Sequence, residues 1–243
     1  MITITHMLSV MTFVSATSFV GDWSDSTPQE LIQLIAENGA RIRSLEAFEL
    51  VTEIESFRSA SDVVPFDTER SVMICAGNRY RVDAMGLTTI QDERHLVTID
   101  SAERMVIVGN VGPVVNEASK ELMRTVLENA VGVGRRKIGG SVEYRVEFLP
   151  KAQYSAMHLV FDQEGYLMST TSYWRFAIKE DPDDPNSAAY KPKLLVRYGR
   201  PRNVQTSVIE KKLRIEGYVR FVDEEPMLAP GWDGFTIHDS RLR

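Results

Sequence analysis

The chain is poor in cysteine, and this scarcity excludes two kinds of stabilising centre. Among its 243 residues only Cys75 is a cysteine, so neither an intrachain disulfide nor a cysteine-based zinc cluster can form within one chain. Cys75 stands in the apolar run at residues 72–76. A free cysteine in such a run behaves as a small buried hydrophobic residue. We therefore expect no metal site and no reactive thiol here.

Excess positive charge is also missing. The chain has 28 Lys and Arg against 34 Asp and Glu, which gives a formal net charge of -6. Affinity for a phosphate backbone depends on clustered Lys and Arg, whereas most basic residues here alternate with acidic or apolar ones, as in residues 79–83. This alternation is typical of a solvated strand face. The sequence therefore does not favour a nucleic-acid partner.

Short catalytic and nucleotide-binding motifs are absent as well. The sequence has no G-x-S-x-G elbow, no G-x-x-x-x-G-K-[ST] phosphate loop and no G-x-G-x-x-G fingerprint. None of its four histidines, His6, His95, His158 and His238, has a second histidine at metal-ligand spacing. We expect no catalytic residues, no cofactor and no enzyme activity. A cleft with clustered titratable groups of strongly shifted pKa would favour an enzyme instead.

No apolar run reaches the roughly 20 residues that a membrane helix needs. Residues 1–7 resemble a leader or a misassigned start, and residues 8–20 are apolar but rich in Ser and Thr. Residues 14–16 match the small-residue cleavage pattern of a secretory signal, although a basic n-region is missing. A first β-strand or a tail is the alternative. We predict a leader or signal-like segment at residues 1–20 and one domain at residues 21–243.

Two helices are predicted. Thr27-Pro28-Gln29-Glu30 has the form of a capping box with proline at the first helical position, and apolar residues follow at helical spacing. Gly39 is a weak point where this helix would bend or end. The second helix covers residues 116–130, and the glycines at 132 and 134 break it. The basic trio at 135–137 would then compensate the helix C-terminus, or form a ligand site.

The remaining segments predict short strands at close intervals. Such strands pair as antiparallel hairpins, because parallel pairing needs a long crossover. A loop rich in Asp, Pro and Asn is expected at residues 180–192, and a Pro- and Gly-rich tail from residue 224, with a last short strand near Phe235 and Ile237. The predicted strands are residues 48–54, 71–76, 79–85, 87–91, 95–99, 105–108, 143–148, 156–161, 166–178, 194–198 and 209–222.

Residues 77–110 resemble the LolA-like family of periplasmic lipoprotein carriers. Residues 79–82 (RYRV) resemble the basic-aromatic strand of that family, and residues 96–100 and 105–108 resemble the two strands of its hairpin. Residues 30–57 resemble its first helix and strand, and the later strands follow its order more loosely. The chain departs from the pattern by Ser101 where glycine is usual, by the loop at 180–192 and by a longer C-terminal region.

The resemblance implies a mostly β (α+β) fold, in which a curled antiparallel sheet forms a half-open barrel covered by helices. It implies a periplasmic, exported carrier, soluble or peripheral to a membrane, whose partners are lipid or lipoprotein acyl chains. The alternative is a non-catalytic interaction subunit of a cell-envelope membrane-protein assembly. Arg79 or Arg81 would gate the cavity. The candidate residues lining the apolar cavity are Met73, Tyr80, Val82, Ile90, Val97, Ile99, Leu159, Phe161, Trp174 and Phe176.

Overall fold

A computed structural model describes residues 23–112, 116–181, 183–184 and 186–241. The leader or signal predicted for residues 1–20 lies outside these ranges. Within them, no helix combines the length and the apolar character that crossing a membrane requires.

One large sheet dominates the molecule, and its strands follow the order β1-β8-β9-β10-β11-β14-β2-β3-β4-β5-β6-β7-β18, with β15 also paired to β2. Every neighbouring pair is antiparallel except β18 and β7, which are parallel. The strands are β1 (Ser24–Ser26), β8 (Ala130–Ile138), β9 (Ser141–Phe148), β10 (Tyr154–Phe161), β11 (Leu167–Trp174), β14 (Lys193–Tyr198), β2 (Ala47–Phe57), β3 (Asp67–Ala76), β4 (Arg79–Ala84), β5 (Leu87–Gln91), β6 (Leu96–Asp100), β7 (Met105–Gly109), β18 (Thr236–Asp239) and β15 (Arg202–Asn203).

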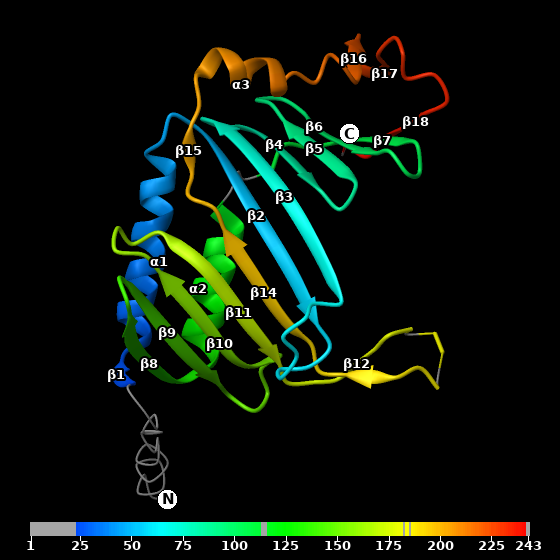
Figure 1. Cartoon of the computed structure of the whole chain (residues 1–243). Coiled ribbons are helices and arrows are strands. Elements are labelled where there is room, and N and C mark those ends of the chain that lie inside the picture. Colours follow the sequence, from blue (N-terminus) through cyan, green and yellow to red (C-terminus); the bar gives the residue numbers. More distant parts are fainter. Residues whose placement is uncertain (1–22, 113–115, 182, 185, 242–243) are drawn as a thin grey trace, which may run out of the picture.

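The sheet is curled but does not close into a barrel (Figure 1). In the described part of the chain its edges are β1 and β18. The predicted fold class, a mostly β protein with one curled antiparallel sheet, is confirmed. The predicted antiparallel hairpins are present from β2 through β7.

Helix α1 (Pro28–Arg43) begins as its sequence predicts. The amide of Glu30 donates to Thr27 Oγ1 over 3.2 Å, and the Glu30 carboxylate accepts from the Thr27 amide over 3.3 Å, which completes the capping box. These bonds satisfy amides that have no partner inside the helix. The helix runs through Gly39 and ends only at Ser44. It lies beside α2 (Asn116–Asn129) against one face of the sheet (Figure 1).

Side chains of a strand alternate between the two faces of the sheet. We call face A the face that α1 and α2 cover; it carries Leu159, and through the strand register also Val196 of β14 and Ile54 of β2. Face B is the opposite face and carries His158 and Arg197.

The largest apolar core lies between face A and the two helices. It joins α1 and α2 to strands β8, β9 and β10, and this burial orders the helices on the sheet. Its buried members are Leu31, Ile35, Val126, Val133, Tyr144, Val146, Phe148, Ala152, Met157, Leu159 and Phe161.

The C-terminal region covers face B near the other end of the sheet. There α3 (Thr206–Lys212) packs on β3, and the hairpin of β16 (Val219–Val222) and β17 (Glu225–Leu228) packs on β5, β6 and β7. The apolar residues of the sheet therefore change faces along its width. A further small hairpin pairs β12 (Ile178–Lys179), just before the loop predicted at 180–192, with β13 (Ala189–Tyr190) within that loop.

Two local predictions are wrong. The segment 209–222 is not one strand, because its first part belongs to α3; Ile209 of α3 and Leu213, which caps the helix end, lie one turn apart and are both buried. The trio at residues 135–137 does not compensate a helix end, because the chain is already in β8 and pairs with β9 there. The glycines at 132 and 134 lie within this strand.

Candidate functional site

Three predicted lining residues lie together on face A. Met73 of β3 pairs with Val82 of β4, and Tyr80 lies two residues from Val82 on the same face. All three are half-buried. The alternation of side chains along neighbouring hairpin strands brings them together, as the sequence indicates.

Five others belong to filled cores. Leu159 and Phe161 lie on face A under the helices and are at most 1% exposed. The other three, Ile90, Val97 and Ile99, lie on face B and are buried against the C-terminal region. The predicted residues therefore do not line one common space, and their ligand-binding role remains a prediction.

The last two predicted residues stand near the end of β11. Trp174 is half-buried and meets the ring of Tyr154 edge to face, with 5.8 Å between centroids. Phe176 follows the strand and is 55% exposed.

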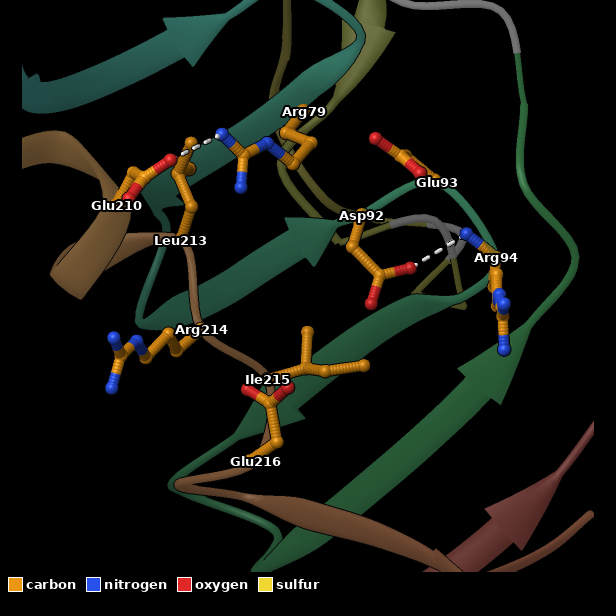
Figure 2. A pocket seen from close by; sticks show the side chains of 9 residues that line it. All are labelled: Arg79, Asp92, Glu93, Arg94, Glu210, Leu213, Arg214, Ile215 and Glu216. Atoms are coloured by element: carbon orange, nitrogen blue, oxygen red, sulfur yellow. Dashed lines mark hydrogen bonds and ion pairs between the residues drawn. The ribbon is translucent and has the colours of Figure 1, made fainter. Parts of the chain in front are cut away.

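Both candidate gating arginines point to face B, away from the core between α1, α2 and the sheet. Arg79 forms an ion pair with Glu210 of α3 over 3.3 Å, in a groove of about 380 Å³ (Figure 2). Arg81 binds Asp83 through both carboxylate oxygens and donates to the Tyr218 hydroxyl over 3.0 Å. These contacts link the sheet to the C-terminal region, so gating by either arginine would act through that region.

The Arg81 contacts also shape the electrostatics of Asp83. Burial acts to raise the pKa of this carboxyl, but hydrogen bonds from Arg81 and Thr88 outweigh burial and hold the pKa below its ordinary value. Asp83 is therefore ionised at neutral pH and keeps Arg81 in place.

Between the helices and the β4–β5 hairpin, face A carries a row of aliphatic side chains that we call the open stripe. The register places Leu50, Met73 and Val82 in one line across β2, β3 and β4, and Ile54 beside Val196 across β2 and β14. The open stripe consists of Leu50, Ile54, Met73, Val82, Leu194 and Val196, and each of them is half-buried.

Hydroxyl side chains divide the open stripe into two groups, and an acidic side chain borders it. On the same face, Thr52 pairs with Ser71 between the Leu50–Met73 pair and Ile54, and Glu69 lies opposite Ile54. On β5, the Gln91 side chain donates to the Gly112 carbonyl and accepts from the Gly112 amide, each over 3.0 Å. The connection from β7 towards α2 therefore crosses face A at β5. The open stripe is thus two neighbouring apolar groups with a hydroxyl pair between them.

A polar cluster that the sequence did not reveal lies on face B. The buried carboxylate of Glu143 in β9 accepts from Arg136 Nε over 2.6 Å and contacts His158 Nδ1 of β10 over 2.8 Å. Trp23 meets the His158 ring edge to face and lies under the Arg136 guanidinium. These residues come from three strands and the chain before β1, so only the strand register could have revealed the cluster.

Burial determines the protonation of this histidine. It lowers the pKa of His158 below its ordinary value of 6.5, and the opposing effect of Glu143 is smaller. His158 is therefore neutral at neutral pH. Since a carboxylate can only accept, the proton sits on Nδ1 and Nε2 is an acceptor.

Comparisons with known proteins give similarity only in architecture. No protein-family model matches the chain, and no curated protein matches it.

Solved structures do align with it at low identity. An uncharacterized conserved protein from Thermus thermophilus aligns with 9% identity and a TM-score of 0.41, covering 85% of this chain and 98% of that one. The lipoprotein LppX from Mycobacterium tuberculosis aligns with 10% identity and a TM-score of 0.38, covering 74% and 99%. A LolA superfamily protein from Nitrosomonas europaea aligns with 12% identity and a TM-score of 0.27, covering 73% and 96%.

These identities and TM-scores are too low to transfer a function. The curled, unclosed antiparallel sheet with helices on one face, which the sequence analysis expects, is confirmed by the strand topology itself.

Proposed function

We propose that the protein is a non-catalytic carrier that holds lipid or lipoprotein acyl chains on the open stripe of face A. The observation that carries this proposal is the row of six aliphatic side chains that remain half-buried next to fully buried neighbours of the same face. Aliphatic side chains without a convergent polar group suit an acyl chain, which offers only methylene groups to bind. An exported, periplasmic location accords with such a cargo.

The strength of such binding depends on the length of the chain. Each methylene removed from water contributes about 0.8 kcal/mol of binding free energy. Association costs about 4 kcal/mol or more, because the ligand loses translational and rotational freedom. A chain of fewer than about six carbons would therefore gain too little to bind. On an open surface, each added methylene should strengthen binding about two- to fourfold.

Titration with saturated fatty acids of increasing length tests the proposal. The protein should bind long chains, with affinity rising at each methylene, and Val82→Thr should weaken binding several-fold because it adds a hydroxyl to the stripe at nearly constant volume. Val160→Thr is the matched control, since Val160 is half-buried on face B of β10. Native mass spectrometry of gently extracted protein should show bound lipid. Equal affinity of both variants, or no lipid in any preparation, would contradict the proposal.

A second candidate function is that of an interaction subunit in an envelope assembly. Val63 and Val64, in the loop between β2 and β3, are 89% and 76% exposed, which is unusual for adjacent apolar residues. Phe66 of the same loop meets the ring of Tyr190 in β13 with 5.9 Å between centroids. The loop between β2 and β3 therefore contacts the β12–β13 hairpin. A stoichiometric partner from native membranes that is lost in a Val63→Ser, Val64→Ser double variant, without loss of fatty-acid binding, would favour this reading.

A further inference from the structure

A second cavity lies on face B, across the sheet from the open stripe. It has a volume of about 750 Å³ and is bounded by β9, β10 and β11, by the loop after β2 and by the chain before β14. In Figure 1 the loop after β2 and the end of β11 meet at the lower end of the sheet. We call this space the face-B pocket. Its lining residues are Ser59, Ala60, Ser61, Arg145, Ser155, Ala156, His158, Tyr173, Trp174, Arg175, Lys191 and Pro192.

The charged residues that line the face-B pocket are all basic. Arg145, Arg175 and Lys191 contribute to its wall, and none of the described residues that line it is Asp or Glu. Glu147 offsets part of this charge, because it accepts from Arg145 over 2.7 Å. Glu143 is buried and bound to Arg136 and His158. The pocket is therefore electropositive and suited to a negatively charged group.

Several neutral groups in the same wall can form hydrogen bonds. His158 and Tyr173 lie with 5.4 Å between ring centroids, and burial raises the pKa of Tyr173, so its hydroxyl keeps its proton. Ser59 and Ser61 lie at the rim in the loop after β2, where the Ser59 hydroxyl donates to Asp62 Oδ1 over 2.9 Å and contacts the Ser61 hydroxyl. Neutral His158 offers Nε2 as an acceptor. The wall thus combines cationic donors, the Tyr173 hydroxyl and one neutral acceptor beside the indole of Trp174.

We propose that the face-B pocket binds a small molecule through an oxyanion, either a phosphate or a carboxylate group. Arg145, Arg175 and Lys191 supply the positive charge, the Tyr173 hydroxyl adds a donor, and His158 accepts from a hydroxyl of the ligand. Charge-assisted hydrogen bonds are the strong ones, and Arg offers a planar fork that fits both oxyanions. The pocket is on the opposite face from the open stripe, so this site does not depend on the proposed acyl-chain binding.

Calorimetric titration of the full chain with inorganic phosphate and with glycerol phosphate tests the inference. The wild-type protein should bind glycerol phosphate saturably, and Lys191→Ala should weaken this binding about tenfold, which is typical for loss of a charge-assisted contact. Lys191 is exposed, so its replacement leaves the fold intact. Lys211→Ala is the matched control, because Lys211 is an exposed lysine of α3, at the other end of the molecule.

A second arm separates a free ligand from a lipid headgroup. Co-sedimentation with vesicles of phosphatidylcholine, with and without phosphatidic acid, should show no binding if the ligand is a free molecule. Binding only to the acidic vesicles, lost in Lys191→Ala, would identify a headgroup as the source of the oxyanion. Absence of binding in both arms, or equal weakening by Lys191→Ala and Lys211→Ala, would overturn the proposal. Inorganic phosphate and glycerol phosphate carry no acyl chain, so the calorimetric arm tests the face-B pocket independently of the open stripe.

Discussion

The single residue with the sharpest expected pH signature is His158. Its folded-state pKa lies below 6.5 because burial disfavours the charged ring. The unfolded chain therefore binds more protons than the folded protein just below pH 6.5, so the free energy of unfolding rises with pH through that window. We expect the thermal unfolding midpoint to fall when the pH is lowered from about 7.5 to about 5.5.

Replacement of the histidine should remove much of this dependence. His158→Gln should flatten the change of unfolding midpoint with pH, because it removes the buried titrating ring. Asp83 and Asp162 do not contribute in this window, because their pKa values are held below their ordinary 3.8. An unchanged pH profile in His158→Gln would show that the ring is not the group responsible.

Some residue contacts at the site could be predicted from the sequence, and others could not. The grouping of Met73, Tyr80 and Val82 was predictable, since both strands and their short turn are visible in the sequence. The contact of His158 with Glu143 was not, because it depends on the register of β9 against β10, where His158 pairs with Arg145. A shift of one residue would place His158 on the other face.

At the scale of strands, β10 and β14 carry leucines on the same face in different surroundings. Leu159 is fully buried under the helices, whereas Leu194 is half-buried in the open stripe. Leu159→Ala should cost about 2–5 kcal/mol of unfolding free energy, as core truncations do. Leu194→Ala should cost about 1 kcal/mol, because less apolar area leaves contact with the protein.

Urea unfolding of both variants measures the difference directly. The fatty-acid affinities should show the reverse order, with the larger loss in Leu194→Ala. If Leu194→Ala were as destabilising as Leu159→Ala and left fatty-acid binding intact, the stripe would be part of the core and not a binding surface.

Elements with strong local signals were predictable, and those defined by distant contacts were not. Helix α1 is predictable from the sequence because Thr27 and Glu30 form a capping box at its start. By contrast, α3 has seven residues and no side-chain bond at its start. Its conformation depends on Ile209 and Leu213 packing over Ala47 and Ile74 of the sheet. Without knowing that face B is apolar there, an apolar run at 209–222 favours a strand.

At the scale of the whole molecule, one sheet carries cores on both faces. Helices α1 and α2 bury face A at the β8–β10 side, and the C-terminal region buries face B at the β5–β7 side. The long strands β2 and β3, paired over ten residues, run between the two regions and belong to both halves of the sheet. Because the covered face changes from A to B across the sheet, the middle of face A is only partly covered, and its half-buried residues form the open stripe.

Because the same strands connect both cores, the chain should unfold as one cooperative unit, as predicted for a single domain at residues 21–243. Trp23 adjoins the His158 cluster and Trp232 belongs to the C-terminal core, so tryptophan fluorescence reports on both ends of the sheet. Fluorescence and far-ultraviolet circular dichroism should give coincident urea transitions.

Two substitutions, one in each core, test whether the chain unfolds as one cooperative unit. Val133→Ala and Val219→Ala should each cost about 2 kcal/mol. The double variant should lose the sum within about 0.5 kcal/mol, because the side chains share no partner. Both single variants should shift the whole transition without splitting it. A split transition, in which Val219→Ala moves only the part reported by Trp232, would mean that the C-terminal core unfolds separately and that the sheet joins two independent units.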